Sequence, residues 1–355
     1  MIRRTVKDVK EMRFLLSVIL FMSLRLALWA GPGDRGYEFL SLPVSSRVSA
    51  LGGANVSVQN NDLNMVSQNP SMLSGELNRA LAVNYFNHIA GVNYGNVAYS
   101  QSIDSVSFWA GCVSYLNYGT FEGYSELGVA DGEFSAGDVC VSAIYARKLS
   151  RRITAGIAFK PVFSYIESYT SFGFGVDVGA NFYDAEHDFS VGLAVKNFGV
   201  QIKGYTTDAR SSLPWDLQVG LTKRLAHAPF RVSLTMVKLN DWDLGYNRSA
   251  RLDDDKINLM DEEPEEFKIS FGDMLLRHAV VGLEFIPSKN FNLQVSYNHR
   301  RRKEFALKES KGASGWAFGA NIHVYKLDLG VSYAINAPKG GVFGLSVVTD
   351  LDLFK

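Results

Sequence analysis

Apolar and polar residues alternate with period two, run after run, from about residue 152 to the C-terminus, and the polar partners are mostly small. Successive side chains of a strand point to opposite faces, so each run predicts a strand with one apolar face and one small polar face. In one such run the apolar residues are Phe172, Phe174, Val176, Val178, Ala180 and Phe182, and those between them are Ser171, Gly173, Gly175, Asp177, Gly179 and Asn181. Repeated around the chain, this pattern predicts an all-β fold, an antiparallel transmembrane barrel whose outer face meets lipid.

The alternation divides the chain after residue 79 into about fourteen strands. We expect them near residues 80–87, 92–102, 105–118, 136–149, 152–165, 170–183, 188–199, 214–225, 229–239, 277–286, 291–302, 313–325, 327–336 and 342–353. Every second link is short, whereas the links over 119–135, 200–213, 240–276 and 303–312 are long. An even strand number, with short turns on one rim and long loops on the other, predicts extracellular long loops and two periplasmic termini.

The first 30 residues have the pattern of an export signal. Basic residues open the chain, and an apolar stretch from Phe14 to Trp29 leads to Ala30 and a following glycine, which suit cleavage. We therefore predict a signal peptide over residues 1–30, with Met12 as an alternative start. An uncleaved membrane anchor is the other interpretation.

Residues 31–78 lack sustained alternation and contain several prolines and glycines. Short helices or turns are expected here, one of them capped by Asn61 or Asp62. A segment of this size before a barrel commonly folds into the lumen, so we predict an N-terminal plug over 31–78 and the barrel proper over 79–355.

Composition changes this picture little. The chain has 355 residues, 36 basic and 36 acidic side chains, net charge +0 and a mean hydropathy of −0.01. No charge excess indicates nucleic-acid binding. Past the N-terminus no uninterrupted apolar stretch of about 18 residues exists, which argues against spanning helices. The 23 Phe, 16 Tyr and 32 Gly suit aromatic girdles and a packed lumen.

The alternation also assigns side chains to the two faces of the predicted barrel. The inward sets carry Thr154, Lys160, Asp177, Lys196, Asp216, Gln218, Arg224, Arg231, Glu284 and Gln294. Charges of both signs would then share the lumen, where they pair with each other and hydrogen-bond to the plug. A wide pore of one charge sign is not indicated.

Two cysteines, Cys112 and Cys140, fall on neighbouring predicted strands. They either form a disulfide across the hairpin or act as two separate buried apolar residues. The six histidines are scattered without metal-ligand spacing, and no nucleophile motif is present. The glycines at 173, 175 and 179 lack the helix that a phosphate loop needs and are better explained as space for the plug. We therefore expect that the protein binds no metal and no cofactor and is not an enzyme.

Two charged clusters lie in the predicted long loops. The acidic one comprises Asp253, Asp254, Asp255, Asp261, Glu262, Glu263, Glu265 and Glu266, and the basic one comprises Arg300, Arg301 and Arg302. A solvated loop is the default interpretation, and a docking surface for a partner is the alternative. The basic cluster suits anionic lipopolysaccharide or an acidic partner face, and the two loops also suit each other.

Several stretches resemble a known family. In the N-terminal part they are Tyr37-Glu38-Phe39-Leu40, Ala50-Leu51-Gly52-Gly53 and Asn69-Pro70-Ser71. A more specific block comprises Leu276-Arg277-His278, Gly282-Leu283-Glu284-Phe285, Tyr297-Asn298-His299-Arg300-Arg301 and Gly315-Trp316-Ala317-Phe318-Gly319. In these residues the chain is similar to the PorQ family of type IX secretion outer-membrane proteins, within the broader FadL-like barrels that include PorV.

The resemblance implies a 14-stranded barrel with a plug and a non-catalytic role in a surface attachment complex. Its expected partners are a PorZ-like surface protein, PorU and PorV, together with outer-membrane lipid and lipopolysaccharide. The alternative function is a FadL-like transporter of hydrophobic molecules, which predicts an apolar pocket beneath the plug. The polar inward side chains count against this alternative, and a barrel enzyme such as a lipase lacks a usable nucleophile and base.

Overall fold

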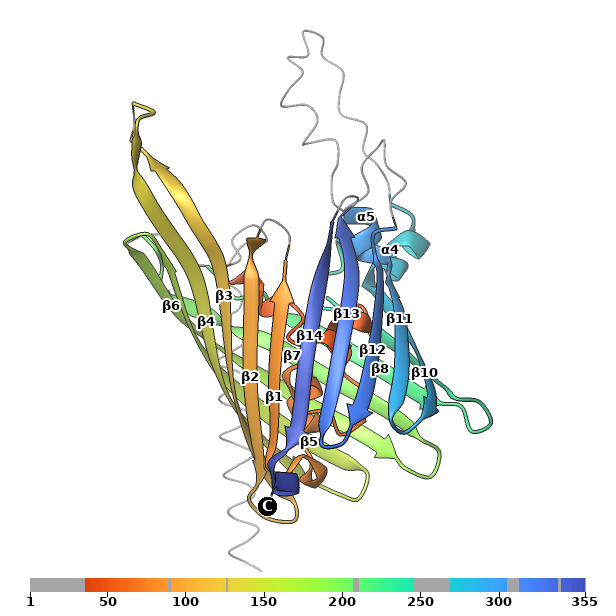
Figure 1. The fold of residues 1–355 in the computed structure, drawn as a ribbon. Helices are drawn as coiled ribbons and strands as arrows, with labels where there is room; N and C mark the ends of the chain where they lie inside the picture. Colours follow the sequence, from red (N-terminus) through yellow and green to blue (C-terminus); the bar gives the residue numbers. More distant parts are fainter. Residues whose placement is uncertain are drawn as a thin grey trace, which may run out of the picture.

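The computed structural model describes residues 36–88, 91–125, 127–206, 211–244, 269–304, 313–337 and 340–354. Within these ranges the chain forms a closed ring of fourteen antiparallel strands, arranged in sequence order, in which β1 pairs with β14 (Figure 1). The predicted all-β antiparallel barrel of about fourteen strands is therefore confirmed. The predicted signal peptide lies outside the described residues.

Each of the fourteen predicted strands is present. Their bounds are β1 Ala80–Asn87, β2 Asn93–Ser102, β3 Ser107–Tyr124, β4 Ala130–Lys148, β5 Ile153–Ile166, β6 Tyr169–Asp184, β7 Phe189–Lys203, β8 Asp216–Arg224, β9 Phe230–Met236, β10 Ala279–Ser288, β11 Phe291–Asn298, β12 Trp316–Val324, β13 Leu327–Ala337 and β14 Gly340–Asp350. Successive side chains of each strand alternate between an apolar outer face and an inner face of small residues. This alternation follows from the local geometry of the strand backbone.

The links differ in length between the two ends of the barrel (Figure 1). Short links at one end, which we call the short-turn rim, cover residues 103–106, 149–152, 185–188, 225–229, 289–290 and 325–326. The opposite end, the long-loop rim, carries the β3–β4 hairpin and the helices α4 (Phe271–His278) and α5 (His299–Glu304). The C-terminal 3-10 turn η7 (Leu351–Phe354) lies at the short-turn rim.

Strands β3 and β4 continue beyond the long-loop rim as a protruding hairpin (Figure 1), although a loop is predicted over residues 119–135. Cross-strand pairing extends to Tyr124 opposite Ala130, and the rings of Phe121 and Phe134 stack with centroids 5.4 Å apart. Glycines in this stretch obscure the alternation in the sequence. Several of them have positive φ, which lets the strands bulge without ending.

Helices replace the ends of two predicted strands. The strand predicted over 291–302 ends at Asn298, because the charged residues that follow form α5. The strand predicted over 277–286 begins at Ala279, because α4 occupies the two preceding positions. These charged residues have a good helix propensity. Because no apolar residues alternate with them, extending the sheet over them would bury no apolar side chains.

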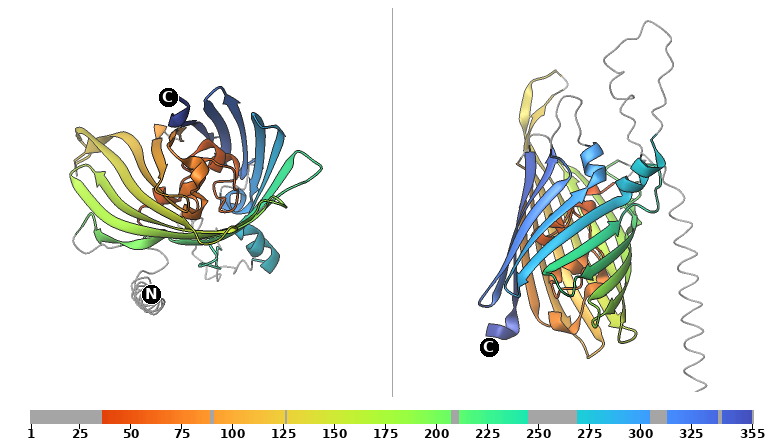
Figure 2. Two further views of the ribbon diagram at one scale, coloured as in Figure 1. Left: turned by 90° about the horizontal axis from the view of Figure 1, so that it is seen from below. Right: turned by 90° about the vertical axis from the view of Figure 1, so that its right-hand side faces the viewer.

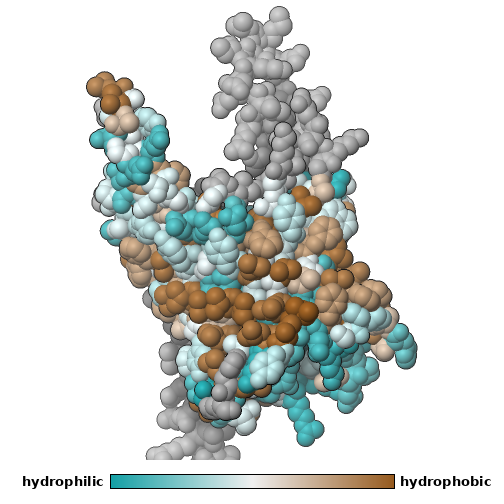
Figure 3. Space-filling view, viewed as in Figure 1, coloured by the Kyte–Doolittle hydropathy of each residue, from teal (hydrophilic) through white to brown (hydrophobic). Residues whose placement is uncertain are grey.

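The outer surface of the strands is apolar. Exposed side chains there include Ile157, Phe159, Leu221, Val331 and Tyr333, and a band of apolar residues crosses the strands in Figure 3. Closure of the barrel leaves no strand edge with unpaired backbone groups, and the apolar band around it suits contact with lipid. In the described part of the chain, no helix is both long enough and apolar enough to cross a membrane.

The N-terminal segment, residues 36–78, forms short helices instead of strands. They are η2 Glu38–Ser41, α2 Ser46–Ala50, η3 Leu63–Ser67, η4 Pro70–Met72 and η5 Gly75–Leu77. Asp62 caps η3, because its carboxylate accepts a hydrogen bond from the backbone N–H of Asn64 at 3.0 Å. Of the two predicted capping residues, Asp62 is thus the one that caps.

Candidate functional site

The N-terminal segment lies inside the ring of strands (Figure 2). It begins near the long-loop rim, where the N–H of Gly36 donates to the carbonyl of Ser212 at 3.0 Å, and it ends where β1 starts at the short-turn rim. Its helix α2 contacts β11, β12, β13 and β14, and η4 contacts β4, β5 and β6. The lumen is therefore the candidate functional site, because any solute that crosses this barrel must pass the segment.

Glycines on the inner face of the strands provide space for this segment. A Cβ atom at Gly179 would overlap Oδ1 of Asn69, and one at Gly192 would overlap the carbonyl oxygen of Val56. Asn69 Nδ2 in turn donates to that same carbonyl at 2.9 Å. At Gly179 the structure thus agrees with the prediction that glycines on the inner strand face leave space for the N-terminal segment.

A buried ion-pair network joins α2 to the barrel wall. Arg47 donates to Oε1 of Glu284 at 2.5 Å, and Arg231 on β9 donates to Oε2 of the same carboxylate at 3.1 Å. Glu284 on β10 is almost fully buried. Both of its oxygens are engaged, so loss of Arg47 would leave Oε1 without its charged donor while Arg231 still holds Oε2.

A second buried group lies on β5, β6 and β7. Lys160 pairs with Asp177, and its ammonium also donates to Oδ1 of Asn197 at 3.1 Å. Asn197 has a positive φ of 54° at a bulge, and its N–H donates to Asp177 at 2.6 Å. Lys196 donates to Gln68 of the N-terminal segment at 3.1 Å. The predicted pairing of lumenal charges is therefore observed here and at Glu284.

The inner face of β1 to β5 differs from the predicted polar lumen. Large apolar side chains are buried there, namely Phe86, Tyr94, Phe108, Leu116, Ile144 and Val162. They pack against apolar residues of the N-terminal segment such as Tyr37 and Phe39. A wall that faces other side chains, and not water, is packed as a protein core.

A cavity lies between this apolar wall and the N-terminal segment. The segment contributes Phe39, Leu40, Leu42, Val44 and Val66, and the wall contributes Tyr94, Ile144 and Ala158 together with both cysteines and Lys160. Its volume is about 40 Å³. A pocket that binds benzene has about 150 Å³, so this cavity holds no apolar ligand until it widens.

The two cysteines face this cavity as free thiols. Cys112 lies opposite Ser142, and Cys140 lies opposite Ser114, so the cysteines occupy diagonal positions on the inner face of β3 and β4. Diagonal neighbours of a sheet are about 7–8 Å apart, farther than directly opposite ones. Both side chains are buried. Whether they form the disulfide considered from the sequence is a question for a chemical test.

The basic cluster of the sequence is divided by α5. Arg302 is exposed, whereas Arg301 turns into the lumen, where its guanidinium packs against Gly53. Arg300 is partly buried and lies 3.7 Å from Glu304. The acidic residues Asp253 to Glu266 lie outside the described residues. Arg301 therefore faces inward and not outward with Arg302, because the open end of the barrel lets its long side chain reach inward, and the docking role of the cluster stays a prediction.

Asp273 on α4 holds α4 and α5 together. Its carboxylate accepts from His299 at 2.8 Å and from Arg277 at 3.0 Å, and Lys303 lies 3.1 Å away. Burial raises the pKa of Asp273, but these three donors together hold it well below its ordinary value. Asp273 belongs to neither charged cluster of the sequence, so the attraction between those two clusters stays a prediction.

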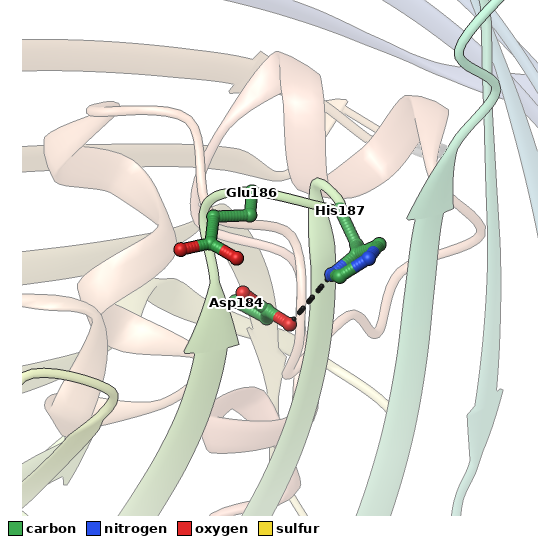
Figure 4. A group of neighbouring side chains, drawn as sticks. All are labelled: Asp184, Glu186 and His187. Carbon is green, nitrogen blue, oxygen red and sulfur yellow. Dashed lines mark hydrogen bonds and ion pairs between the residues drawn. The ribbon is translucent and has the colours of Figure 1, made fainter.

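A cluster of possible metal ligands lies in the β6–β7 turn at the short-turn rim. Asp184, Glu186 and His187 have ligand atoms within 4.8 Å of one another, and the His187 ring is hydrogen-bonded to Asp184 (Figure 4). Arg152 lies 3.5 Å from Asp184 and 3.9 Å from Glu186. Because a fixed cation already faces both carboxylates, we assign no metal to this cluster.

Comparison with known proteins finds proteins of similar structure but no match by sequence. No protein-family model matches the chain, and no curated protein matches it. The toluene transporter TodX of Pseudomonas putida has a TM-score of 0.50 and 11% identity, covering 89% of this chain and 97% of its own. A FadL homologue of Pseudomonas aeruginosa has a TM-score of 0.43 and 10% identity, covering 90% and 99%.

At 11% identity the similarity to TodX shows the fold alone. The chain has the architecture of FadL-like outer-membrane barrels. Nothing in these comparisons points to PorQ or to type IX secretion, so that part of the resemblance stays a hypothesis.

Proposed function

We propose that this protein is an integral outer-membrane channel for small apolar molecules, closed in this structure by its N-terminal segment. The observation that carries this proposal is the cavity between Phe39 and Leu42 of the segment and Ile144 and Ala158 of the wall, whose lining is mainly apolar and also includes the Lys160–Asp177 pair, Lys196 and Gln68. The fold shared with a toluene transporter supports the same function.

Passage requires the N-terminal segment to shift, because the cavity of about 40 Å³ is smaller than any aromatic hydrocarbon site. The segment is attached to β10 by Arg47 and Glu284 and to β7 by Gln68 and Lys196. The apolar contacts near Ala158 are non-directional, so they tolerate a shift that the ion pair does not. We infer that the segment opens on the side of β3 to β5 while remaining attached at β10.

The test is uptake of labelled toluene by cells that lack their own channel and express this protein. We expect uptake to rise with the wild type. Ala158→Trp, which fills the cavity from β5, should return it to background. Val141→Trp is the matched control, because Val141 lies on the lipid-facing side of β4 and is 46% exposed.

Heat-modifiable gel mobility of each variant shows whether the barrel has folded. Uptake by the wild type at the level of empty cells would overturn the proposal. Equal uptake by folded Ala158→Trp and wild type would place the route elsewhere and remove the cavity from it.

A second candidate function is anchoring of a surface partner, as the family resemblance implies. The specific observation in its favour is the β3–β4 hairpin, which protrudes from the long-loop rim with Tyr124, Leu127 and Val129 strongly exposed (Figure 1). Exposed apolar tips of this kind commonly mark interaction sites. We propose that the long-loop rim faces outward, where lipid, lipopolysaccharide and a PorZ-like protein with PorU and PorV are the candidate partners.

Affinity purification in mild detergent tests this second function. A tagged wild-type protein should retain a surface protein that is lost when the hairpin is shortened to 118–136 with a two-residue turn. Deletion of 250–266 tests the acidic cluster in the same way. Recovery of the barrel alone at native expression argues against anchoring.

A further inference from the structure

A second lumenal cavity lies near the long-loop rim, apart from the apolar one. Its volume is about 50 Å³, and the turn after α2, the wall of β7 and β8, and α5 all line it. Four of the lining side chains are cationic, namely Lys196, Lys238, Arg300 and Arg301, and one is a carboxylate, Asp216. The cavity therefore has a surplus of positive charge on its walls.

The single carboxylate is already engaged by neutral donors. Asp216 accepts from the backbone N–H of Lys238 at 2.6 Å and from Gln218 Nε2 at 2.6 Å. Lys196 lies opposite Asp216 in the β7–β8 register, and its ammonium donates to the neutral amide of Gln68. Asp216 is thus engaged on the side of β7 and β8, and it does not neutralise the two arginines that line the cavity from α5.

Arg301 is the clearest case of an uncompensated cation. Its guanidinium donates to the neutral Asn336 Oδ1 at 3.3 Å, and within the described part of the chain no ion pair neutralises it. Burial, and then the neighbouring charge of Arg300, lower the pKa of Arg301 to about 10. Arg300 Nε is buried without a hydrogen bond, since its nearest carboxylate oxygen, Oε1 of Glu304, lies 3.7 Å away. Two guanidinium groups thus have free donors at one cavity.

We propose that this cavity binds a small inorganic oxyanion of the phosphate or sulfate class. The planar donors of two arginines match the oxygens of such an anion, and Lys196 supplies further charge. The turn at Gly52 and Gly53 brings backbone close to Arg301, and a Cβ at Gly53 would overlap the guanidinium. The anion would link α5 and the wall to the N-terminal segment independently of the proposed channel function.

The test is calorimetric titration of the purified full-length protein with phosphate at constant ionic strength, set against chloride. We expect saturable binding of phosphate to the wild type. Arg301→Gln and Arg300→Gln should each weaken it about tenfold to a hundredfold, as expected for a lost charge-assisted hydrogen bond. Arg302→Gln is the matched control, because it removes the neighbouring exposed charge and does not line the cavity.

Arg301→Lys keeps the charge and removes the paired donors, so this variant should bind phosphate with intermediate affinity. Thermal unfolding without phosphate checks that each variant folds. Absence of saturable binding in the wild type overturns the proposal. An equal loss in Arg302→Gln also overturns it, since the site would then be a diffuse surface charge.

Discussion

Arg47 and Glu284 lie 237 residues apart in the chain and form a buried hydrogen-bonded ion pair at 2.5 Å in the lumen. Arg231 holds the other oxygen of the same carboxylate. The pair ties the N-terminal segment to a particular strand, β10, and so sets the position of everything the segment contacts. Directional bonds to a buried charge give this specificity, whereas the apolar contacts elsewhere do not.

Glu284→Gln should strongly weaken the attachment of the N-terminal segment. Removal of one partner from a buried pair leaves uncompensated charge, here two arginines, and costs about 3–5 kcal/mol. Urea unfolding in detergent and protease cleavage within residues 36–78 measure the loss. Glu186→Gln is the control, because Glu186 lies in the β6–β7 turn at the short-turn rim, is 78% exposed and lies 3.9 Å from Arg152. An equal effect of both variants would contradict the proposed attachment.

Gly192→Ala should displace the N-terminal segment while leaving the barrel closed. The added Cβ overlaps the carbonyl of Val56, which is backbone and cannot rotate away. Overpacking of this kind costs about 1–3 kcal/mol. Gly95→Ala is the matched control on β2, where no atom lies within 4 Å of the new Cβ. Proteolysis of residues 36–78 should increase in the first variant only, and equal protection in both would argue against the contact.

The cysteines should react as two free thiols after denaturation without reductant. In the folded barrel a polar maleimide should label neither, because Cys112 is 7% and Cys140 is 4% exposed. Mass spectrometry after alkylation counts the modified residues. Loss of 2 mass units with no alkylation on unfolding would show the disulfide that the sequence also allows. Rapid labelling in the folded state would instead show that the lumen is open near β3 and β4.

The contact between α4 and α5 should be lost on acidification through Asp273. Its pKa is lower in the folded protein than its ordinary value of about 3.9, so the stabilisation is complete above that value and is lost as pH falls below it. Hydrogen exchange of α4 and α5, corrected for the intrinsic rate, should show protection at pH 5 and progressive loss below about pH 4.

Asp273→Asn removes the charge that His299, Arg277 and Lys303 share. Exchange of α4 should then be fast at every pH, with no change near pH 4. Asp243→Asn is a control acid in the same connection that is absent from these contacts. Protection of α4 in Asp273→Asn equal to that of the wild type would show that packing alone holds the helices.

The strands were predictable because alternation is a local signal. The positions of Phe172 and Gly173 on opposite faces follow from backbone geometry alone, and the surrounding lipid makes the apolar face visible in the sequence. The prediction fails where no alternating residues exist. The glycines of the β3–β4 hairpin and the charged residues of α5 carry no period-two signal, so the hairpin and the helix emerge only when neighbouring strands are in place.

The contents of the lumen were only partly predictable. Charged inward residues such as Lys160 and Glu284 indicate a polar lumen, and their pairing with other lumenal charges is as expected. The apolar wall around Ile144 and Ala158 was missed, because an inward apolar residue looks the same in the sequence as an outward one when the alternation of the first strands is irregular. A run of large residues on both faces of β1 to β5 was the signal that could have indicated it.

The sequence by itself determined the closed barrel, the face of most strand residues and the presence of short helices before the barrel, one of them capped by Asn61 or Asp62. The tertiary structure decided that Arg301 turns inward, that Cys112 and Cys140 are diagonal, and that Arg47 meets Glu284. The reason is physical: alternation and capping depend on residues a few positions apart, whereas the partners of a lumenal side chain come from strands far apart in the chain. They meet only when β14 closes the ring against β1.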